Sequence, residues 1–160
     1  MTQPVTTPAP MPPPHMQPAR VASVLKETHD TFTLTVEPRG PQPLAGFAPG
    51  QFSMLYVFGI GELPISISGD PYDGGKLVYT VRSVGKATHA LVHRKPGDSI
   101  GIRGPFGTSW PVEEARGRDV LIVAGGIGLA PLRPAIHHIL RNRDDYIRLI
   151  IMYGARSPRD

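Results

Sequence analysis

Apolar and polar residues alternate along much of the chain between residues 20 and 103, at the two-residue period of half-buried β-strands. The first two such segments enclose the polar pair His29-Asp30 and predict a hairpin. A short helix is predicted at Gly85–Lys95, with Ala90 and Leu91 facing inward. The predicted strands are Arg20–Thr28, Thr31–Glu37, Gln51–Phe58, Pro64–Ser68, Lys76–Ser83 and Ser99–Arg103. Six short strands with one short helix predict an antiparallel six-stranded β-barrel.

Glycine, proline and aspartate gather between these strands, because they supply the dihedral angles of tight turns. Pro38–Gly50 and Gly104–Pro111 are predicted loops, and Asp70–Gly75 is a predicted turn. Residues 1–18 are rich in proline, threonine and glutamine. Proline lacks a backbone donor and fixes φ, so this segment is predicted to be a disordered, extended tail.

The pattern changes after Gly117. Asp119–Ala124 is a short, continuous apolar run, as in a strand that a parallel sheet buries on both faces. Gly125–Pro131 is a glycine-rich turn, and Ile147–Tyr153 is a second apolar strand. Between them, Leu132–Asn142 is a predicted helix with one apolar stripe of Leu132, Ala135, Ile136, Ile139 and Leu140. The segment predicts a βαβ unit with a right-handed crossover.

Two parallel strands and one helix cannot cover both faces of a parallel sheet. Ser157-Pro158 also has the residue types of a helix start, with serine at the N-cap and proline at the first helical position. We therefore expect the incomplete start of an α/β nucleotide-binding domain, in a fragment, a truncated reading frame or a chain that a partner completes. The expected organisation is a tail at 1–18, a barrel domain at 19–112 and an incomplete α/β domain at 117–160.

Composition narrows the classes of function. The sequence has no cysteine, which excludes disulfides, thiolate nucleophiles and cysteine-ligated zinc or iron–sulfur centres within it. The net charge is +4, but the 17 lysines and arginines are scattered and only 7% of residues are aromatic, so no nucleic-acid partner is expected. No apolar run reaches the roughly 18 residues that span a bilayer, and the start does not resemble a signal peptide. No membrane association and a cytoplasmic location are expected.

A glycine-rich turn follows the first apolar strand and opens the predicted helix. Gly125, Gly126 and Gly128 allow a tight turn and the close approach of a pyrophosphate to backbone N–H groups, and Pro131 suits a first helical turn. The turn therefore indicates a dinucleotide site, with an ordinary tight βα turn as the alternative.

Three barrel segments carry weaker signals. Leu63–Ser68 (L-P-I-S-I-S) places Ile65 and Ile67 on one face of a strand and Ser66 and Ser68 on the other. Arg82–Thr88 (R-S-V-G-K-A-T) lies at a strand–helix junction that could hold a phosphate. Taken by itself, Gly97–Gly107 (G-D-S-I-G-I-R-G-P-F-G) predicts only a strand followed by a loop.

Taken in order with V-A-G-G-I-G-L-A-P and Y-G-A-R, these segments resemble the ferredoxin–NADP reductase-like family over about residues 18–160. The resemblance is strongest to the FAD/NAD(P)-binding gamma subunits of cytoplasmic nickel–iron hydrogenases. Related subunits serve anaerobic sulfite reductases and dihydroorotate dehydrogenases. Leu63 and Ile65 depart from the family's R-x-[YF]-S flavin motif, which weakens Leu63 as a flavin ligand.

The resemblance implies a set of cofactor-binding residues. Near the isoalloxazine they are Pro64, Ile65, Ser66 and Ile67. Near the ribityl chain and phosphate they are Val81, Arg82 and Ser83, and around the FAD pyrophosphate they are Gly85, Lys86, Ala87 and Thr88. The NAD(P) pyrophosphate turn corresponds to Gly125, Gly126, Gly128 and Pro131, and the segment near the adenosine ribose corresponds to Gly154, Ala155 and Arg156. No catalytic side chain and no metal ligand are implied.

The implied activity is that of a FAD-dependent NAD(P)H oxidoreductase, an electron-transfer subunit that passes electrons between NAD(P)H and a redox partner such as a hydrogenase. The sequence does not choose between NAD and NADP. Relatives of the gamma type pass electrons to a cysteine-held iron–sulfur cluster near the C-terminus. This chain has no cysteine, so a [2Fe–2S] cluster is expected only in a missing C-terminal part.

Two other functions stay open. The chain could be a truncated, non-catalytic docking module of a redox complex, or a binder of a phosphate-rich ligand or nucleic acid. His89 and His93 have the four-residue spacing of metal ligands on a helix, but a third ligand is not evident, and we expect them to be surface or packing residues.

Overall fold

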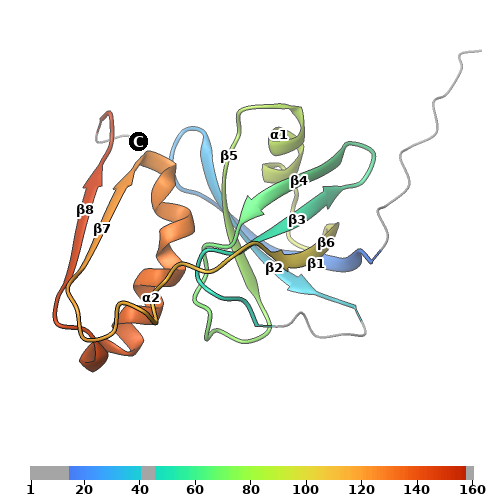
Figure 1. The fold of residues 1–160 in the computed structure, drawn as a ribbon. Helices are drawn as coiled ribbons and strands as arrows, with labels where there is room; N and C mark the ends of the chain where they lie inside the picture. Colours follow the sequence, from blue (N-terminus) through green and yellow to red (C-terminus); the bar gives the residue numbers. More distant parts are fainter. Residues whose placement is uncertain (1–14, 41–45, 158–160) are drawn as a thin grey trace, which may run out of the picture.

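The computed structural model describes residues 15–40 and 46–157, which form a barrel and a smaller α/β unit (Figure 1). Most of the predicted tail, part of the predicted loop at 38–50 and the end of the predicted helix start at 157–160 lie outside the described residues. Helix α2 (Arg133–Arg141) lies between the parallel strand pair and the barrel (Figure 1). The interface between the two units therefore runs along this helix.

Six antiparallel strands form the barrel, as predicted, in the order β4-β3-β6-β1-β2-β5. An isolated bridge between Ile67 and Tyr79 joins the end of β4 to β5 and closes the sheet on itself. The strands are β1 (Gln17–Lys26), β2 (Thr31–Pro38), β3 (Phe52–Val57), β4 (Gly61–Ser66), β5 (Leu77–Arg82) and β6 (Ser99–Phe106).

The largest differences from the predicted strand boundaries are at β1, β4 and β6, because pairing with neighbours overrides local propensity. Strand β1 begins at Gln17, which pairs with Ile102 of β6, although proline follows it. Strand β4 begins at Gly61, where it turns back from β3, and not at Pro64. Strand β6 continues through the predicted loop as far as Phe106, which pairs with Phe52.

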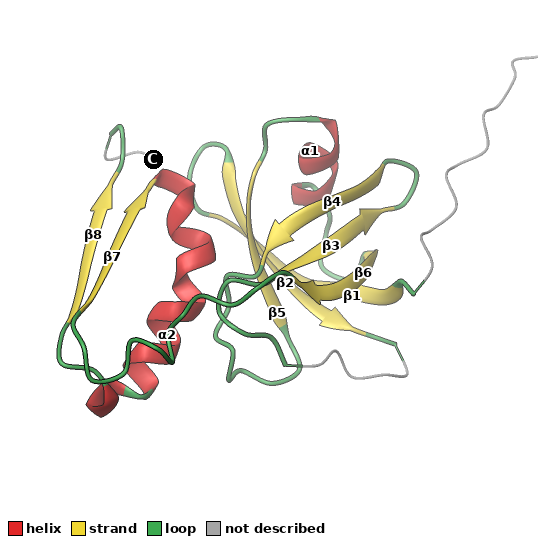
Figure 2. Cartoon of the chain, viewed as in Figure 1, coloured by secondary structure: helices red, strands yellow, loops and turns green. Residues whose placement is uncertain are grey.

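The barrel encloses one apolar core, which helix α1 (Lys86–Val92) covers at one end (Figure 2). Alternate residues of β5 point inward, and Leu91 and Val92 of α1 are buried against the same core. Tyr79 is fully buried, and its hydroxyl donates a 2.8 Å hydrogen bond to Ser53 Oγ. Burial raises the pKa of Tyr79. The inward positions of Ala90 and Leu91 agree with the helix predicted there, with Ala90 only partly buried.

The second unit contains β7 (Val120–Gly125), the 3₁₀ segment η1 (Gly126–Leu132), α2, the 3₁₀ turn η2 (Arg143–Asp145) and β8 (Leu149–Gly154). Strands β7 and β8 pair in parallel, which agrees with the predicted start of an α/β domain. A small core of Val112, Ile122, Ala135, Ile139 and Tyr146 joins β7 to α2.

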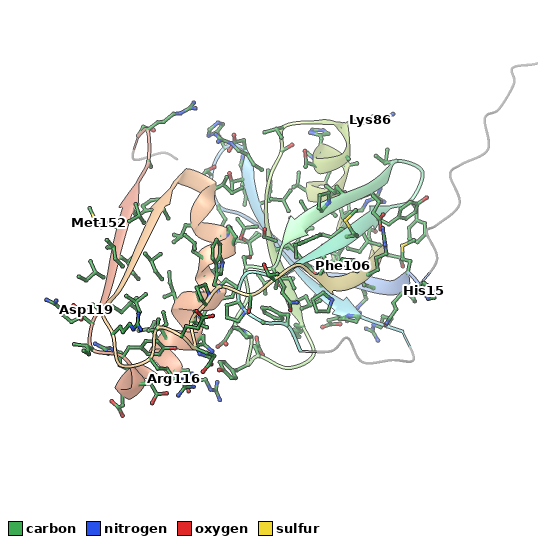
Figure 3. All side chains as sticks on the ribbon, in the orientation of Figure 1. His15, Lys86, Phe106, Arg116, Asp119 and Met152 are labelled. Atoms are coloured by element: carbon green, nitrogen blue, oxygen red, sulfur yellow. The ribbon has the colours of Figure 1, made fainter. Side chains whose placement is uncertain are left out.

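Only one face of the β7–β8 pair is covered, since one helix can pack on only one face. Leu121 and Val123 of β7 are exposed, as is Met152 of β8, which points away from the barrel in Figure 3. The predicted burial of these strands on both faces is therefore wrong for the described residues. Leu140, assigned to the apolar stripe of α2, is also exposed. Among the described residues, none of the helices combines the length and apolarity that a bilayer span requires.

Candidate cofactor site

The end of β4 forms one wall of the candidate flavin site. Pro64 is exposed and Ser66 is half-buried, so both reach the barrel surface, whereas Ile65 is half-buried and packs against the barrel core. Ile67 is 1% exposed and belongs to the core. Ser68 is also fully buried, and its hydroxyl lies 3.0 Å from Thr80 Oγ1. The predicted alternation therefore stops at Ser66, where β4 ends.

The next predicted residues lie at the end of β5. Val81 is buried in the barrel core, so only its backbone can face a ligand. The Arg82 guanidinium donates a 2.6 Å hydrogen bond from Nε to Asp30 Oδ2, in the turn between β1 and β2. The Asp30 carbonyl also accepts a 2.8 Å hydrogen bond from the Ser83 amide. These two contacts tie the hairpin turn to the strand that leads into α1.

The hydrogen bond from Arg82 lowers the pKa of Asp30 from 3.8 to about 2. A carboxyl group with a depressed folded-state pKa contributes stability above its unfolded pKa, and this contribution is lost as the pH falls through the folded value. We expect wild type to be more stable than Asp30→Asn near neutral pH and to lose this extra stability as the pH falls from about 4 to about 2. Denaturant midpoints of both proteins between pH 2 and pH 6 measure this difference. A difference between the two midpoints that does not change with pH would contradict the assignment of this stability to the Asp30–Arg82 ion pair.

Gly85 is the N-cap of helix α1, and its backbone is extended at φ −158 and ψ 174. The Thr88 hydroxyl accepts hydrogen bonds from the Gly85 amide (3.0 Å) and the Val84 amide (3.1 Å). It donates to the Gly85 carbonyl. Thr88 therefore holds the strand–helix junction in shape. Lys86 lies at the exposed end of the helix (Figure 3), and the first-turn N–H groups have no preceding helical carbonyl to bind.

The glycine turn forms the second part of the site. Gly126 has φ +50, a left-handed conformation that glycine adopts without strain, and η1 begins at this residue. Gly125 pairs with Gly154 at the carboxyl ends of β7 and β8. The turn and the segment Gly154–Arg156 therefore lie at the same sheet edge, where α/β folds bind nucleotides. Pro131 lies within η1 and faces the barrel through its carbonyl group.

A cavity of about 400 Å³ separates the barrel from η1. Of the predicted site residues, only Gly126 lines it. Thr33 and Thr80 face it from neighbouring strands, with hydroxyl oxygens 3.2 Å apart. The other lining residues are Glu27, Thr28, Thr31, Ile127, Leu129, Ala130, Arg133 and Tyr153. The two-residue spacing of Thr31 and Thr33 was visible in the sequence, but their approach to Thr80 and η1 depends on strand pairing.

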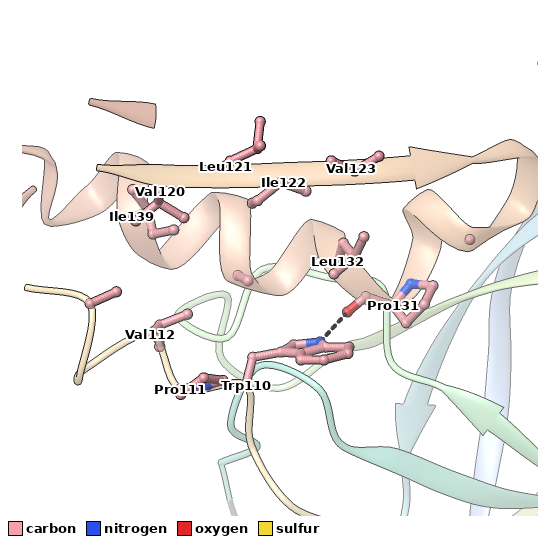
Figure 4. Close-up of a pocket in the computed structure, with 13 residues that line it drawn as sticks. Trp110, Pro111, Val112, Val120, Leu121, Ile122, Val123, Pro131, Leu132 and Ile139 are labelled. Carbon is pink, nitrogen blue, oxygen red and sulfur yellow. Dashed lines mark hydrogen bonds between the residues drawn. The ribbon is translucent and has the colours of Figure 1, made fainter. Parts of the chain in front are cut away.

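A second cavity, of about 560 Å³, lies beside β7 (Figure 4). Gly128 and Pro131 line it together with apolar residues such as Leu121, Val123 and Ile139. It has no ionisable side chain among its lining residues, so it offers packing surface and no acid–base chemistry.

His89 of α1 and His93, the C-cap residue of that helix, contact each other. The rings of His89 and His93 lie 4.1 Å apart, and His93 Nδ1 lies 2.8 Å from the His89 carbonyl oxygen. Within residues 15–40 and 46–157, no three histidine, aspartate or glutamate side chains are arranged to hold a metal ion.

The chain is similar in sequence to known electron-transfer subunits. No protein-family model matches it. It is 39% identical over 137 residues to the sulfhydrogenase 1 subunit gamma of Pyrococcus furiosus, a match that covers 85% of this chain and 47% of the relative. It is 33% identical to a probable dihydroorotate dehydrogenase B (NAD(+)) electron transfer subunit of Methanocaldococcus jannaschii, covering 88% of this chain and 48% of that protein.

Solved structures show the same fold. The ferredoxin reductase in carbazole 1,9a-dioxygenase matches 94% of this chain and 45% of its own, with a TM-score of 0.76 and 25% identity. The ferredoxin NADP+ reductase of Neisseria gonorrhoeae, solved with bound FAD and NADP, has a TM-score of 0.75 at 20% identity and covers 90% of this chain and 59% of its own. The chain spans about half the length of the curated relatives it matches.

Proposed function

Because the chain belongs to the ferredoxin–NADP reductase-like family, close to hydrogenase gamma subunits, we propose that its barrel binds FAD and that its second unit contributes to an NADH or NADPH site. The observation that carries the proposal is the position of the glycine turn. It lies at the carboxyl edge of a parallel strand pair and shares a cavity with the outer face of the barrel. Two cofactors bound there would meet between the units.

The residues present fit a flavin. Pro64 and Ser66 offer an accessible wall for the ring, Ile65 contributes its backbone and the exposed part of its side chain, and Ile67 contributes only backbone. Val81, Arg82 and Ser83 lead from this wall to α1, with Asp30 fixing the arginine in place. Around the pyrophosphate we assign Gly85, Lys86, Ala87 and Thr88, since the helix start offers unpaired N–H groups and Lys86 a positive charge. Bound FAD would supply hydride acceptance from reduced nicotinamide and single-electron release.

In the second unit we assign the nucleotide pyrophosphate to Gly125, Gly126 and Gly128. Because Gly126 supplies the left-handed turn, the backbone beside it can approach a phosphate closely. Pro131 stiffens η1, and Gly154, Ala155 and Arg156 lie at the end of β8, near the expected ribose position. This chain's residues bind and orient both cofactors and perform no proton transfer in this scheme.

We further propose that electrons pass between the nicotinamide nucleotide and other subunits of a redox complex of the hydrogenase type. The names of the relatives support exchange with other subunits, since they describe subunits of a sulfhydrogenase and of a dihydroorotate dehydrogenase. A [2Fe–2S] cluster, if the complex uses one here, has its ligands outside this cysteine-free chain.

A docking module without turnover is the second candidate. The exposed apolar face of β7 and β8 favours it, since such faces commonly mark interaction sites. The visible spectrum distinguishes the two functions. The purified chain should show flavin bands that survive desalting after incubation with FAD. A protein that stays colourless, although folded by circular dichroism, would favour the docking module.

The assignment of the FAD pyrophosphate to α1 predicts a selective effect of Gly85→Asp. Aspartate is a favourable N-cap residue, the backbone of Gly85 is extended, and nothing lies within 4 Å of an added Cβ, so the apoprotein should keep its stability. The new carboxylate would repel the pyrophosphate. We expect at least a tenfold rise in the dissociation constant of FAD, about 1.4 kcal/mol, by fluorescence titration.

Gly74→Asp is the matched control, because it adds the same charge at another open position. It should leave FAD affinity unchanged. An equal loss of FAD affinity in both variants would show that the added net charge causes it. Unchanged FAD affinity in Gly85→Asp would contradict the assignment of the pyrophosphate to the start of α1.

A further inference from the structure

Two side chains of the barrel unit contact the α2 segment near its opposite ends. Trp110 reaches the residues just before the helix, and Tyr72 reaches the residues at its end. Contacts at two separated points fix the direction of a helix as well as its position. The glycine turn precedes α2 directly, so whatever fixes this helix also fixes the turn.

Trp110 is held by the barrel. Its backbone amide donates a 2.7 Å hydrogen bond to the Pro49 carbonyl. It packs on Gly50, where φ is +102 and an added Cβ would lie 2.9 Å from the Trp110 amide nitrogen. From this base the indole Nε1 donates to the Pro131 carbonyl at 3.2 Å (Figure 4). The first contact therefore joins the barrel to η1.

Tyr72 makes the second contact from the turn between β4 and β5. Its hydroxyl lies 2.8 Å from Nδ1 of the buried His138, and Asn142 Nδ2 donates to the hydroxyl at 3.3 Å. The Tyr72 ring stacks on the imidazole at 5.9 Å between centroids. The Arg141 guanidinium lies 4.5 Å from the centre of the same ring. Four interactions thus converge on one tyrosine.

The carboxylate of Glu113 favours one tautomer of His138. Glu113 Oε1 lies 3.0 Å from Nε2, although Nε2 has no partner at hydrogen-bonding angles. A hydrogen bond from Arg116 lowers the pKa of Glu113 and so keeps it ionised. Negative charge at this distance favours a proton on Nε2, which leaves Nδ1 to accept the Tyr72 O–H.

We propose that Tyr72 and Trp110 form a two-point clamp that sets the angle between the barrel and α2, and that Tyr72 is a positioning residue for the meeting of nicotinamide and flavin. The inference rests on the proposed function. Tyr72 touches neither cofactor site, and it acts through His138 and the helix that carries the glycine turn. Reactions between two bound partners depend steeply on distance and angle, so a small rotation of α2 has a large effect on rate.

The test compares Tyr72→Phe, which removes only the hydroxyl, with Tyr79→Phe, which removes a hydroxyl bonded within the barrel. Three quantities are measured: the dissociation constant of FAD, the anaerobic rate of flavin reduction by NADH or NADPH, and acrylamide quenching of the single tryptophan. Tyr72→Phe should leave FAD affinity within about twofold, slow reduction about tenfold and increase the quenching of Trp110. Tyr79→Phe should leave the rate and the quenching at wild-type values.

Equal reduction rates in wild type and Tyr72→Phe would overturn the positioning role, whatever the change in thermal stability. A wild-type chain that binds no FAD, or that neither nucleotide reduces, would instead overturn the proposed function and the positioning role together. The two-point clamp is then tested by the quenching of Trp110 fluorescence alone. Greater quenching in Tyr72→Phe supports the clamp, and unchanged quenching overturns it.

Discussion

Leu91→Ala is expected to lower the free energy of unfolding of the barrel by about 2–5 kcal/mol, because alanine leaves a cavity in a core that cannot fully collapse around it. Leu91 is 0% exposed and joins α1 to the residues enclosed by the strands. Helix α1 has seven residues, too few to be stable without this packing. The variant should therefore also bind FAD more weakly, since the first turn of α1 carries the proposed pyrophosphate site.

Leu25→Ala is the control for this substitution. Leu25 is 59% exposed on β1, so the same truncation should change stability by no more than about 0.5 kcal/mol. Denaturant unfolding followed by circular dichroism measures both variants, and fluorescence titration measures FAD. An unchanged midpoint in Leu91→Ala would show that α1 is not anchored through this side chain.

Ile139→Ala should destabilise the second unit by a similar amount, about 2–5 kcal/mol. Ile139 is 0% exposed and packs with Val112, Ile122 and Tyr146 in a small core, where one lost side chain is a large share of the buried apolar surface. Since η1 and α2 make the Pro131 and His138 contacts to the barrel, loosening this core should also raise the solvent exposure of Trp110.

Leu140→Ala is the matched control one position along the helix, where the side chain is 55% exposed. It should change stability by no more than about 0.5 kcal/mol. Tryptophan emission reports the interface and circular dichroism reports the helix during denaturant unfolding. If both variants unfold at the wild-type midpoint, Ile139 does not carry the packing of α2 that its burial indicates.

The existence and type of nearly every described element could be predicted from local pattern. The alternation in Lys76–Ser83 gave β5 to within a residue, because outward and inward positions of a half-buried strand differ in polarity. The apolar run at Asp119–Ala124 gave β7, and the glycines after it gave the turn, which the structure forms as a 3₁₀ segment. The family resemblance came from the order of these segments.

Other features depend on residues far apart in the chain. Strand β6 runs through Gly104 and Pro105 because β3 pairs with it as far as Phe106. Arg82 donates a hydrogen bond to Asp30, 52 positions away, so its positive charge is paired with a carboxylate in the hairpin turn. Ile67 and Val81 were predicted site residues, yet their side chains are in the core, because family motifs record which backbone meets a ligand and not where each side chain points.

The sequence by itself determined the antiparallel barrel strands, the parallel strand pair that follows them and the glycine turn, since alternation, continuous apolar runs and clustered glycines are all local patterns. The tertiary structure decided which residues of the predicted apolar stripe of α2 are buried, since Ile139 is buried and Leu140 is exposed. It also decided which polar groups meet across the interface, as with Tyr72 and His138. The physical reason is that the width of a buried face and long-range hydrogen bonding depend on how complete elements pack, which local pattern encodes only in part.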